Sequence, residues 1–145
     1  GIPADAELIA IGDYTTEVAI TCARQLLSLV DRPTAIFAAN DMSAMGVYQV
    51  AREFGLHIPA DLSVIGFDNL CEAAYLNPPL TTVDQFLEKT GTVATEMLIK
   101  LAQGEALSIE NNLYTIPTQL VIRDSCACAP CHSPDEPPGA SGVTS

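Results

Sequence analysis

Short apolar runs that alternate with amphipathic segments constrain this fold more than any other feature of the sequence. The runs over 35–39 and 62–67 contain no charged residue, which is typical of strands covered on both faces. Apolar residues at spacings of three and four predict helices over 16–30, 42–54 and 87–101. Strands that alternate with helices predict an α/β, doubly wound fold with a mostly parallel sheet.

The remaining segments complete the predicted order of elements. An apolar run over 7–11 is typical of a buried strand, since a Gly-Asp turn follows it. A short helix is expected over 71–76, where an Asn-Pro-Pro sequence ends it. The segments over 80–83 and 113–122 are expected to be extended, and Pro117 inside the second indicates an edge strand or a break between sheets.

Residues that favour helix ends stand at the predicted boundaries. Thr15 or Thr16 can cap the first helix, and Asp41 can cap the second, because their side-chain oxygens accept hydrogen bonds from free backbone amides. Gly55 and Gly104 follow the second and third helices, where a left-handed residue commonly closes the last turn.

Composition and charge exclude several functions. The chain has 145 residues, enough for one domain. Its six Lys and Arg against 18 Asp and Glu give a net charge of -12, which repels nucleic-acid phosphates. No apolar run reaches the about 18 residues that span a membrane, and no signal peptide is recognisable. Five cysteines, two of them in apolar segments, favour a reducing environment, so we expect a cytoplasmic protein without membrane contact.

The sequence contains no motif of a known catalytic or cofactor site within its folded part. It lacks GxSxG, HExxH, the phosphate-binding GxxxxGK[ST] and the glycine-rich dinucleotide fingerprint. We therefore predict that the chain is not an enzyme and holds no cofactor.

The segment over 126–145 differs from the rest of the chain. Cys126, Cys128, Cys131 and His132 stand there among prolines and glycines. They include the CxxCH of c-type haem attachment, and three thiolates with an imidazole also suit zinc. Haem attachment requires export, and the segment has no hydrophobic period. We expect a disordered, exposed tail and no metal.

Polar residues follow the predicted strands at their carboxyl ends, where doubly wound folds bind ligands. They are Asp13 with Tyr14, Asn40 with Asp41, and Asp68 with Asn69, and Gln85 after the segment over 80–83 is a fourth candidate. Carboxylates and amides beside an aromatic ring suit a hydroxyl-rich sugar or a nucleobase-like molecule. Structural interpretations stay open, since Asp41 is favoured as a helix cap and Tyr14 can be an aromatic at the rim.

Several of these motifs, in order, resemble the effector-sensing domain of the lac-repressor/galactose-repressor (LacI/GalR) family of bacterial transcriptional regulators. The resemblance covers about residues 1–125. The segments that carry it are 33–41 (PTAIFAAND), 55–59 (GLHIP), 61–68 (DLSVIGFD), 79–83 (PLTTV) with Gln85, and 117–125 (PTQLVIRDS).

The resemblance implies a type I periplasmic-binding-protein-like fold of two subdomains, here incomplete. Residues 1–125 would form an effector-sensing domain that is mainly the C-terminal subdomain, with part of the crossover to the first subdomain at roughly 84–110. The family's DNA-binding helices and most of the first subdomain are absent from the sequence. By position, the effector-binding residues would be Tyr14, Asn40, Asp68, Gln85 and Leu87. The homodimer interface would include Met42, Met45, Tyr48, Cys71 and Tyr75.

The resemblance also implies a function. The chain would be the part of a repressor that binds a small, sugar-like or nucleobase-like effector and controls operator affinity allosterically. Operator DNA would be bound only through the absent N-terminal region. The alternative is a periplasmic sugar-binding protein of an ABC importer, and a fragment with no independent function is a third interpretation.

Overall fold

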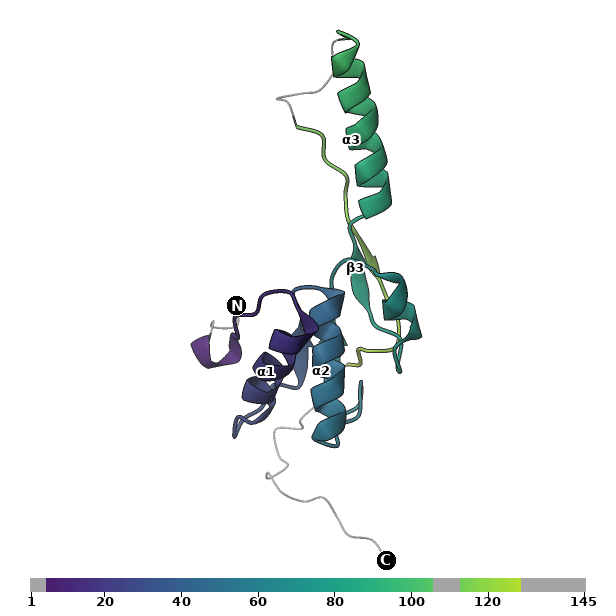
Figure 1. The fold of residues 1–145 in the computed structure, drawn as a ribbon. Helices are drawn as coiled ribbons and strands as arrows, with labels where there is room; N and C mark the ends of the chain where they lie inside the picture. The colour runs from purple at the N-terminus through teal and green to yellow at the C-terminus, as the bar shows by residue number, and fades with distance from the viewer. Residues whose placement is uncertain (1–4, 106–112, 129–145) are drawn as a thin grey trace, which may run out of the picture.

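The computed structural model describes residues 5–105 and 113–128, which form a body and one projecting arm (Figure 1). The body contains α1, α2 and the strands β1 and β2, and α3 forms the arm. In chain order the elements are a 3-10 helix η1 (Ala6–Leu8), α1 (Thr16–Leu27), β1 (Ala35–Phe37), α2 (Asp41–Glu53), β2 (Ser63–Ile65), a 3-10 helix η2 (Cys71–Tyr75), β3 (Thr82–Asp84), α3 (Leu87–Ala102) and β4 (Gln119–Val121).

The described strands form two short pairs joined by one bridge. β1 and β2 are parallel, with Ile36 opposite Val64, and a parallel bridge from Ile65 to Thr81 continues this sheet. β3 and β4 then pair antiparallel. The alternation of strand and helix follows the prediction, but the described residues do not form one wide doubly wound sheet.

The helices of the body pack on each other at a small residue. The Thr15 hydroxyl caps α1 by accepting a hydrogen bond from the Val18 amide at 3.3 Å. A Cβ at Gly46 of α2 would lie 2.9 Å from the Cβ of Ala19, so any larger residue there would force the two helices apart. α1 ends at Leu27, three residues earlier than the predicted 16–30, and Val30 is consequently exposed.

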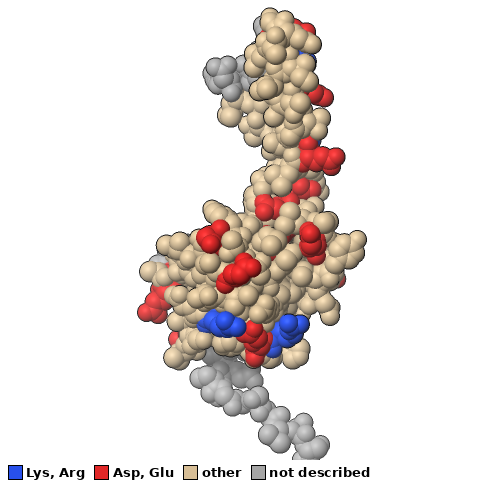
Figure 2. Space-filling model, viewed as in Figure 1, with Lys and Arg blue, Asp and Glu red and all other residues tan. Residues whose placement is uncertain are grey.

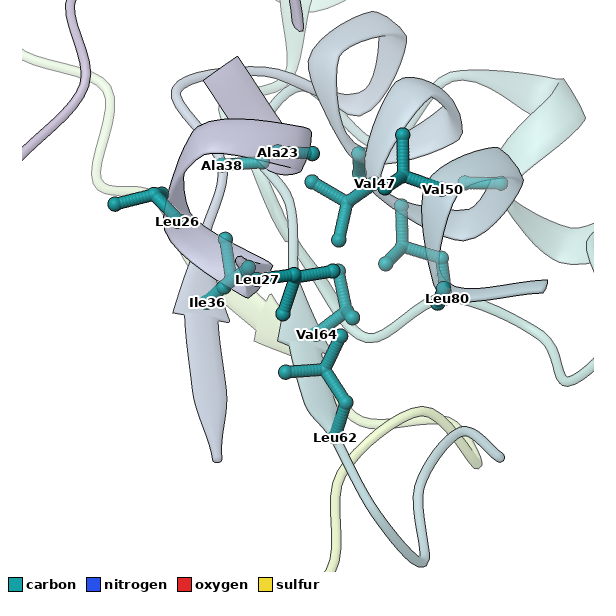
Figure 3. Packing of buried hydrophobic residues seen from close by; sticks show 13 residues of the cluster. Ala23, Leu26, Leu27, Ile36, Ala38, Val47, Val50, Leu62, Val64 and Leu80 are labelled. Atoms are coloured by element: carbon teal, nitrogen blue, oxygen red, sulfur yellow. The ribbon is translucent and has the colours of Figure 1, made fainter. Parts of the chain in front are cut away.

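The core lies between these helices and one face of the β1–β2 pair (Figure 3). Alternate strand residues point to opposite sides, and Ile36 is buried while Phe37 is 64% exposed. The prediction that this strand is covered on both faces is therefore wrong for the described residues. The core residues are Ala23, Leu26, Leu27, Ile36, Ala38, Ala44, Val47, Val50, Ala51, Leu62, Val64, Ala73 and Leu80.

Two local predictions are corrected. The segment over 7–11 is not a strand: Asp5 accepts a hydrogen bond from the Glu7 amide at 3.0 Å and starts η1, and no described strand pairs with the residues that follow. The cap of α2 is Asn40 and not Asp41, because the Asn40 side chain accepts a hydrogen bond from the Ser43 amide at 2.8 Å. Asp41 is fully buried.

The arm is a helix as predicted, but its apolar stripe is not covered. α3 has no buried residue, and Leu98 and Leu101 are 71% and 55% exposed. Between α3 and residues 113–118 lies a groove of about 710 Å³, lined by Met97 and Tyr114 among others. Gly104 follows the helix in the expected left-handed conformation, as Gly55 does after α2.

Candidate functional site

The ends of three extended segments lie side by side on the body. The Asp41 amide donates to the Phe67 carbonyl at 2.8 Å, and the Asp68 amide donates to the Val83 carbonyl at 2.9 Å. These bonds place the residues after β1, β2 and β3 at one edge, as the carboxyl ends of neighbouring parallel strands require. The predicted neighbourhood of Asn40, Asp68 and Gln85 follows from this arrangement.

Asp68 and Gln85 contact each other directly. The Gln85 side-chain amide donates a hydrogen bond to Oδ1 of Asp68, and both side chains are half-buried. The carboxylate keeps acceptor capacity on Oδ2, and the amide oxygen of Gln85 is a further acceptor. Such a pair suits hydroxyl or amine groups of a ligand.

Asn40 joins the cap of α2 to the loop that carries Tyr14. Its Oδ1 caps the helix, and its Nδ2 donates to the Tyr14 carbonyl at 3.1 Å. The Thr16 hydroxyl adds a bond to the Met42 carbonyl at 2.9 Å. The Tyr14 ring is 67% exposed, so it is available to an apolar face of a ligand.

The backbone is unusual at this edge of the molecule. Tyr14, Asp68, Asn69 and Phe86 have φ values of 70°, 115°, 55° and 52°. They are the non-glycine residues with positive φ in the described part of the chain. L-residues adopt this region at a cost, and such residues cluster at ligand sites where neighbouring contacts hold them.

A cleft of about 620 Å³ opens beside Asp68, within the size range of small-molecule sites. Asn69, Asp84, Leu87 and Lys89 are also part of its lining. The structure thus brings two predicted residues, Asp68 and Leu87, into one cleft.

Tyr14 lines a different, smaller hollow of about 280 Å³ with Cys22, Phe37 and Ser43. Gln85 contributes to the groove beneath α3. The predicted site residues therefore share one edge of the molecule, but they do not converge on one cavity.

A cluster of polar side chains around the buried Asp41 and Thr82 adjoins the site. The sequence pointed to Asp41 and Asn69 at the strand ends, but not to their partners Thr82 and Arg123. Asp41 accepts hydrogen bonds from the Thr82 hydroxyl at 2.6 Å and from the Leu70 amide at 2.8 Å. Burial raises the pKa of Asp41 above its usual range, and these two hydrogen bonds oppose that shift. Arg123 donates to the Asn69 side-chain oxygen at 2.8 Å and to the Leu80 carbonyl at 2.7 Å.

Two signals in the sequence relate to this cluster. Thr81 and Thr82 are polar residues between Leu80 and Val83 in the predicted extended segment, and Arg123 is the only Lys or Arg after Lys100. Asn69 completes the arrangement on the solvent side by donating to Asp84 at 3.0 Å.

The residues predicted for a dimer interface lie on α2 and η2. Met42 and Tyr75 are 40% and 87% exposed, Cys71 is exposed and Met45 is half-buried. Tyr48 is half-buried as well, and its hydroxyl donates a hydrogen bond to the Pro78 carbonyl at 2.9 Å. Burial raises the pKa of this tyrosine to about 12.

Charge is unevenly distributed over the surface. Figure 2 shows acidic side chains over the body and at the base of the arm, while basic side chains gather at the opposite end of the body. A salt bridge of 2.7 Å joins Arg24 to Glu53. The lining of the Asp68 cleft contains the carboxylates of Asp68, Asp84 and Glu88 against one basic residue, Lys89, which suits a neutral or cationic ligand better than a phosphate.

Metal and membrane features are absent from the described ranges. Within residues 5–105 and 113–128, no three His, Cys, Asp or Glu side chains come together to hold a metal ion. Cys126 and Cys128 are exposed there, whereas the predictions for Cys131 and His132 fall outside the described residues. None of the described helices has the length and apolar character to cross a membrane.

Comparison with known proteins gives consistent matches. A family model described as a periplasmic binding protein-like domain matches residues 1–126. The chain is 38% identical over 125 residues to the HTH-type transcriptional repressor PurR of Photobacterium profundum. That match covers 86% of this chain and 37% of the repressor. The chain therefore spans little more than a third of the length of this relative.

The solved structures that match this chain also include transcriptional regulators. The transcriptional regulator CelR in complex with cellobiose matches with a TM-score of 0.78 and 30% identity, over 86% of this chain and 37% of that chain. The lac repressor dimer bound to operator and the anti-inducer ONPF matches with a TM-score of 0.71 and 32% identity, over 79% and 39%. Most of the chain is thus similar to one part of longer proteins.

Proposed function

Because the chain belongs to the periplasmic binding protein-like domain family, in the form found in LacI-type transcriptional regulators, we propose that it binds the small-molecule effector of such a regulator. The observation that carries this proposal is the Asp68–Gln85 pair, which lies at the strand ends beside the cleft. Asn40, Tyr14 and Leu87 are proposed as further contacts, from the neighbouring strand end, the preceding loop and the start of α3.

The proposed effector is a neutral, hydroxyl-rich molecule, sugar-like or nucleobase-like. Asp68 accepts hydrogen bonds from hydroxyl or amine groups, and its negative charge disfavours an anionic ligand. The cellobiose complex of a similar regulator supports the sugar class. The exposed Tyr14 ring is available to cover an apolar face of such a ligand.

Effector binding is proposed to control operator affinity in a longer, homodimeric protein. The matched PurR is named a helix-turn-helix repressor, and the matched lac repressor structure is a dimer bound to operator. Operator DNA would be bound by a part of the regulator that this acidic chain does not span. These names favour a cytoplasmic regulator over the receptor of an ABC importer, and over an enzyme.

The proposed dimer interface consists of exposed or half-buried residues of α2 and η2. They are Met42, Met45, Tyr48, Cys71 and Tyr75. The proposed domain organisation has residues 1–125 as the effector-sensing domain and 126–145 as a tail. Within it, 84–110 cross toward a first subdomain, and the exposed apolar stripe of the projecting α3 supports this crossover (Figure 1).

Substitution of Asp68 tests the proposed function. We expect D68N to weaken binding of the best ligand in a panel of cellobiose, other neutral sugars and purine bases by about tenfold or more, since a charge-assisted hydrogen bond contributes about 1.5–3 kcal/mol. Isothermal titration calorimetry measures the Kd. D31N, which removes an exposed carboxylate elsewhere in the chain, is the matched control. Equal affinities for D68N, D31N and the parent chain would contradict the proposal.

A further inference from the structure

Asp41 is a buried carboxylate that the site described so far does not explain. It is fully buried, it does not cap α2, and it does not line the Asp68 cleft. A buried carboxylate is costly unless hydrogen bonds compensate it. Its position at the start of α2 contributes, because anions are favourable at a helix N-terminus. Its other partners come from segments that carry the site.

The partners of Asp41 converge from two segments on one turn. Its Oδ1 accepts from the Thr82 hydroxyl of β3 at 2.6 Å, and its Oδ2 accepts from the Leu70 amide at 2.8 Å. The oxygen of Thr82, also fully buried, accepts from the Asn69 amide at 3.4 Å. Two successive backbone amides after Asp68 are thus held by one buried pair of side chains.

This turn has the backbone conformation that most needs support. Asp68 and Asn69 have φ values of 115° and 55°, a combination that costs free energy in L-residues. Without acceptors, the amides of Asn69 and Leu70 would lose the bonds that compensate this cost. Asp41 also lies directly against the segment that leads into the turn, since a Cβ at Gly66 would collide with Oδ1 of Asp41.

A second contact fixes the turn from the other side. Arg123, two residues beyond β4, donates to the Asn69 side-chain oxygen at 2.8 Å, and the Asn69 amide group donates to Asp84 at 3.0 Å. The backbone and the side chain of Asn69 are therefore both engaged. The Asp68 side chain, one residue earlier, is the part of the turn that faces Gln85 and the cleft.

We propose that Thr82 and Asp41 are positioning residues of the effector site, which hold the Asp68–Leu70 turn in its strained shape and thereby fix the Asp68 carboxylate against Gln85. The effector role of Asp68 rests on the proposed function. The conformation of the turn does not, and it is measurable without any ligand.

Substitutions at Thr82 separate hydrogen bonding from packing. T82V has nearly the same shape as threonine, but it removes both the donor to Asp41 and the acceptor of the Asn69 amide. T82S keeps the hydroxyl and removes only a methyl group. A difference between these two variants therefore reports on the hydrogen bonds.

Nuclear magnetic resonance on the full 145-residue chain reads out the turn. In T82V we expect the Asn69 and Leu70 amides to exchange with solvent at least about tenfold faster, while the core amide of Val64 keeps its rate. The side-chain amide signals of Gln85 should move toward those of a free glutamine. Those of Gln49, which donates to Glu53 on α2 at 3.1 Å, should stay in place.

The outcomes distinguish the proposal from a purely structural role. T82S is expected to match the parent chain in all these signals. Unchanged Asn69, Leu70 and Gln85 signals in a folded T82V would overturn the proposal, and so would equal loosening in T82S and T82V. If T82V does not fold, D41N is used in its place, because it keeps the side-chain volume and removes the anionic acceptor. Faster exchange of the Asn69 and Leu70 amides in D41N would then support the proposal, and unchanged exchange would overturn it. Because no ligand is used, failure here leaves the D68N test of the proposed function intact.

Discussion

The body and the arm contain helices of the same amphipathic type with opposite burial. α1 and α2 bury four and six residues respectively, whereas the longer α3 buries none. In Figure 1 the two body helices lie against each other and the strands, and α3 stands apart from them. An apolar stripe thus predicts that a helix forms, but not where its partner lies.

The difference follows from what each helix has within reach. α1 and α2 cross closely at Gly46 and cover the β1–β2 pair. α3 borders a groove with the extended residues 113–118, and its first turns border the Asp68 cleft, but neither contact buries any of its residues. Since the chain spans 37% of the length of a matched repressor, the proposed partner of the α3 stripe is the first subdomain of the longer regulator.

Truncation of a core residue has the largest expected effect on this contrast. Leu62 is fully buried, and L62A should lower the free energy of unfolding by about 2–5 kcal/mol, through lost burial and a residual cavity. L98A in the arm removes an equal number of atoms from a side chain that is 71% exposed. This substitution should change the free energy of unfolding by less than about 0.5 kcal/mol. Urea denaturation measures both. Equal losses would mean that the arm is packed as tightly as the body.

Two helix glycines test the same contrast at smaller magnitude. G46A places a methyl group 2.9 Å from the Cβ of Ala19 and from the backbone oxygen of Thr16, so we expect a loss of about 1–3 kcal/mol from overpacking. At Gly91 on α3 a Cβ meets nothing within 4 Å, and G91A should favour the helix by up to about 1 kcal/mol. Urea denaturation and circular dichroism give the two signs. A stabilising G46A would contradict the close crossing.

The sequence predicted the helices of the body and of the arm well, because periodic patterns and caps are local. Helices over 41–53 and 87–102, the left-handed Gly55, and the Thr15 cap all follow from residues within one or two turns. The prediction of a strand over 7–11 is wrong because a strand needs a neighbouring strand, and the described residues provide none at that place.

Asn40 and Asp41 show where local reasoning ends. Both residue types are good helix caps, so preference alone does not choose between them. The choice is made by tertiary partners: Asp41 turns inward to Thr82 and Leu70, and Asn40 takes the cap.

The residues of the candidate site also fall into those that local sequence and topology predict and those that only the folded chain reveals. Asn40, Asp68 and Gln85 were predictable because strand topology places them at one edge. Arg123 was not, because 54 positions separate it from Asn69, and only the folded chain brings them within 2.8 Å.

The smallest expected effect concerns a surface contact of the body that the arm lacks. Hydrogen bonds from Gln49 and Arg24 hold the pKa of Glu53 below its usual range. Because the pKa of this carboxyl is lower in the folded state than in the unfolded state, its ionisation stabilises the fold at a pH above the unfolded-state pKa. This stabilisation is lost as the pH falls through the folded-state pKa. E53Q should therefore reduce Tm by no more than about 2 °C at pH 7, and the difference should shrink as the pH falls through the lowered pKa of Glu53 or as the salt concentration rises.

E96Q on α3 is the matched control, because no salt bridge of Glu96 occurs among the residues that the structure describes. It should change Tm less than E53Q does at pH 7, since the described part of the chain shows no salt bridge of Glu96 that the substitution would remove. A difference for E53Q that persists at a pH low enough to protonate Glu53 would assign the effect to side-chain packing across α1 and α2. In that case the body and the arm would differ in burial alone, and surface electrostatics would have no part in the contrast.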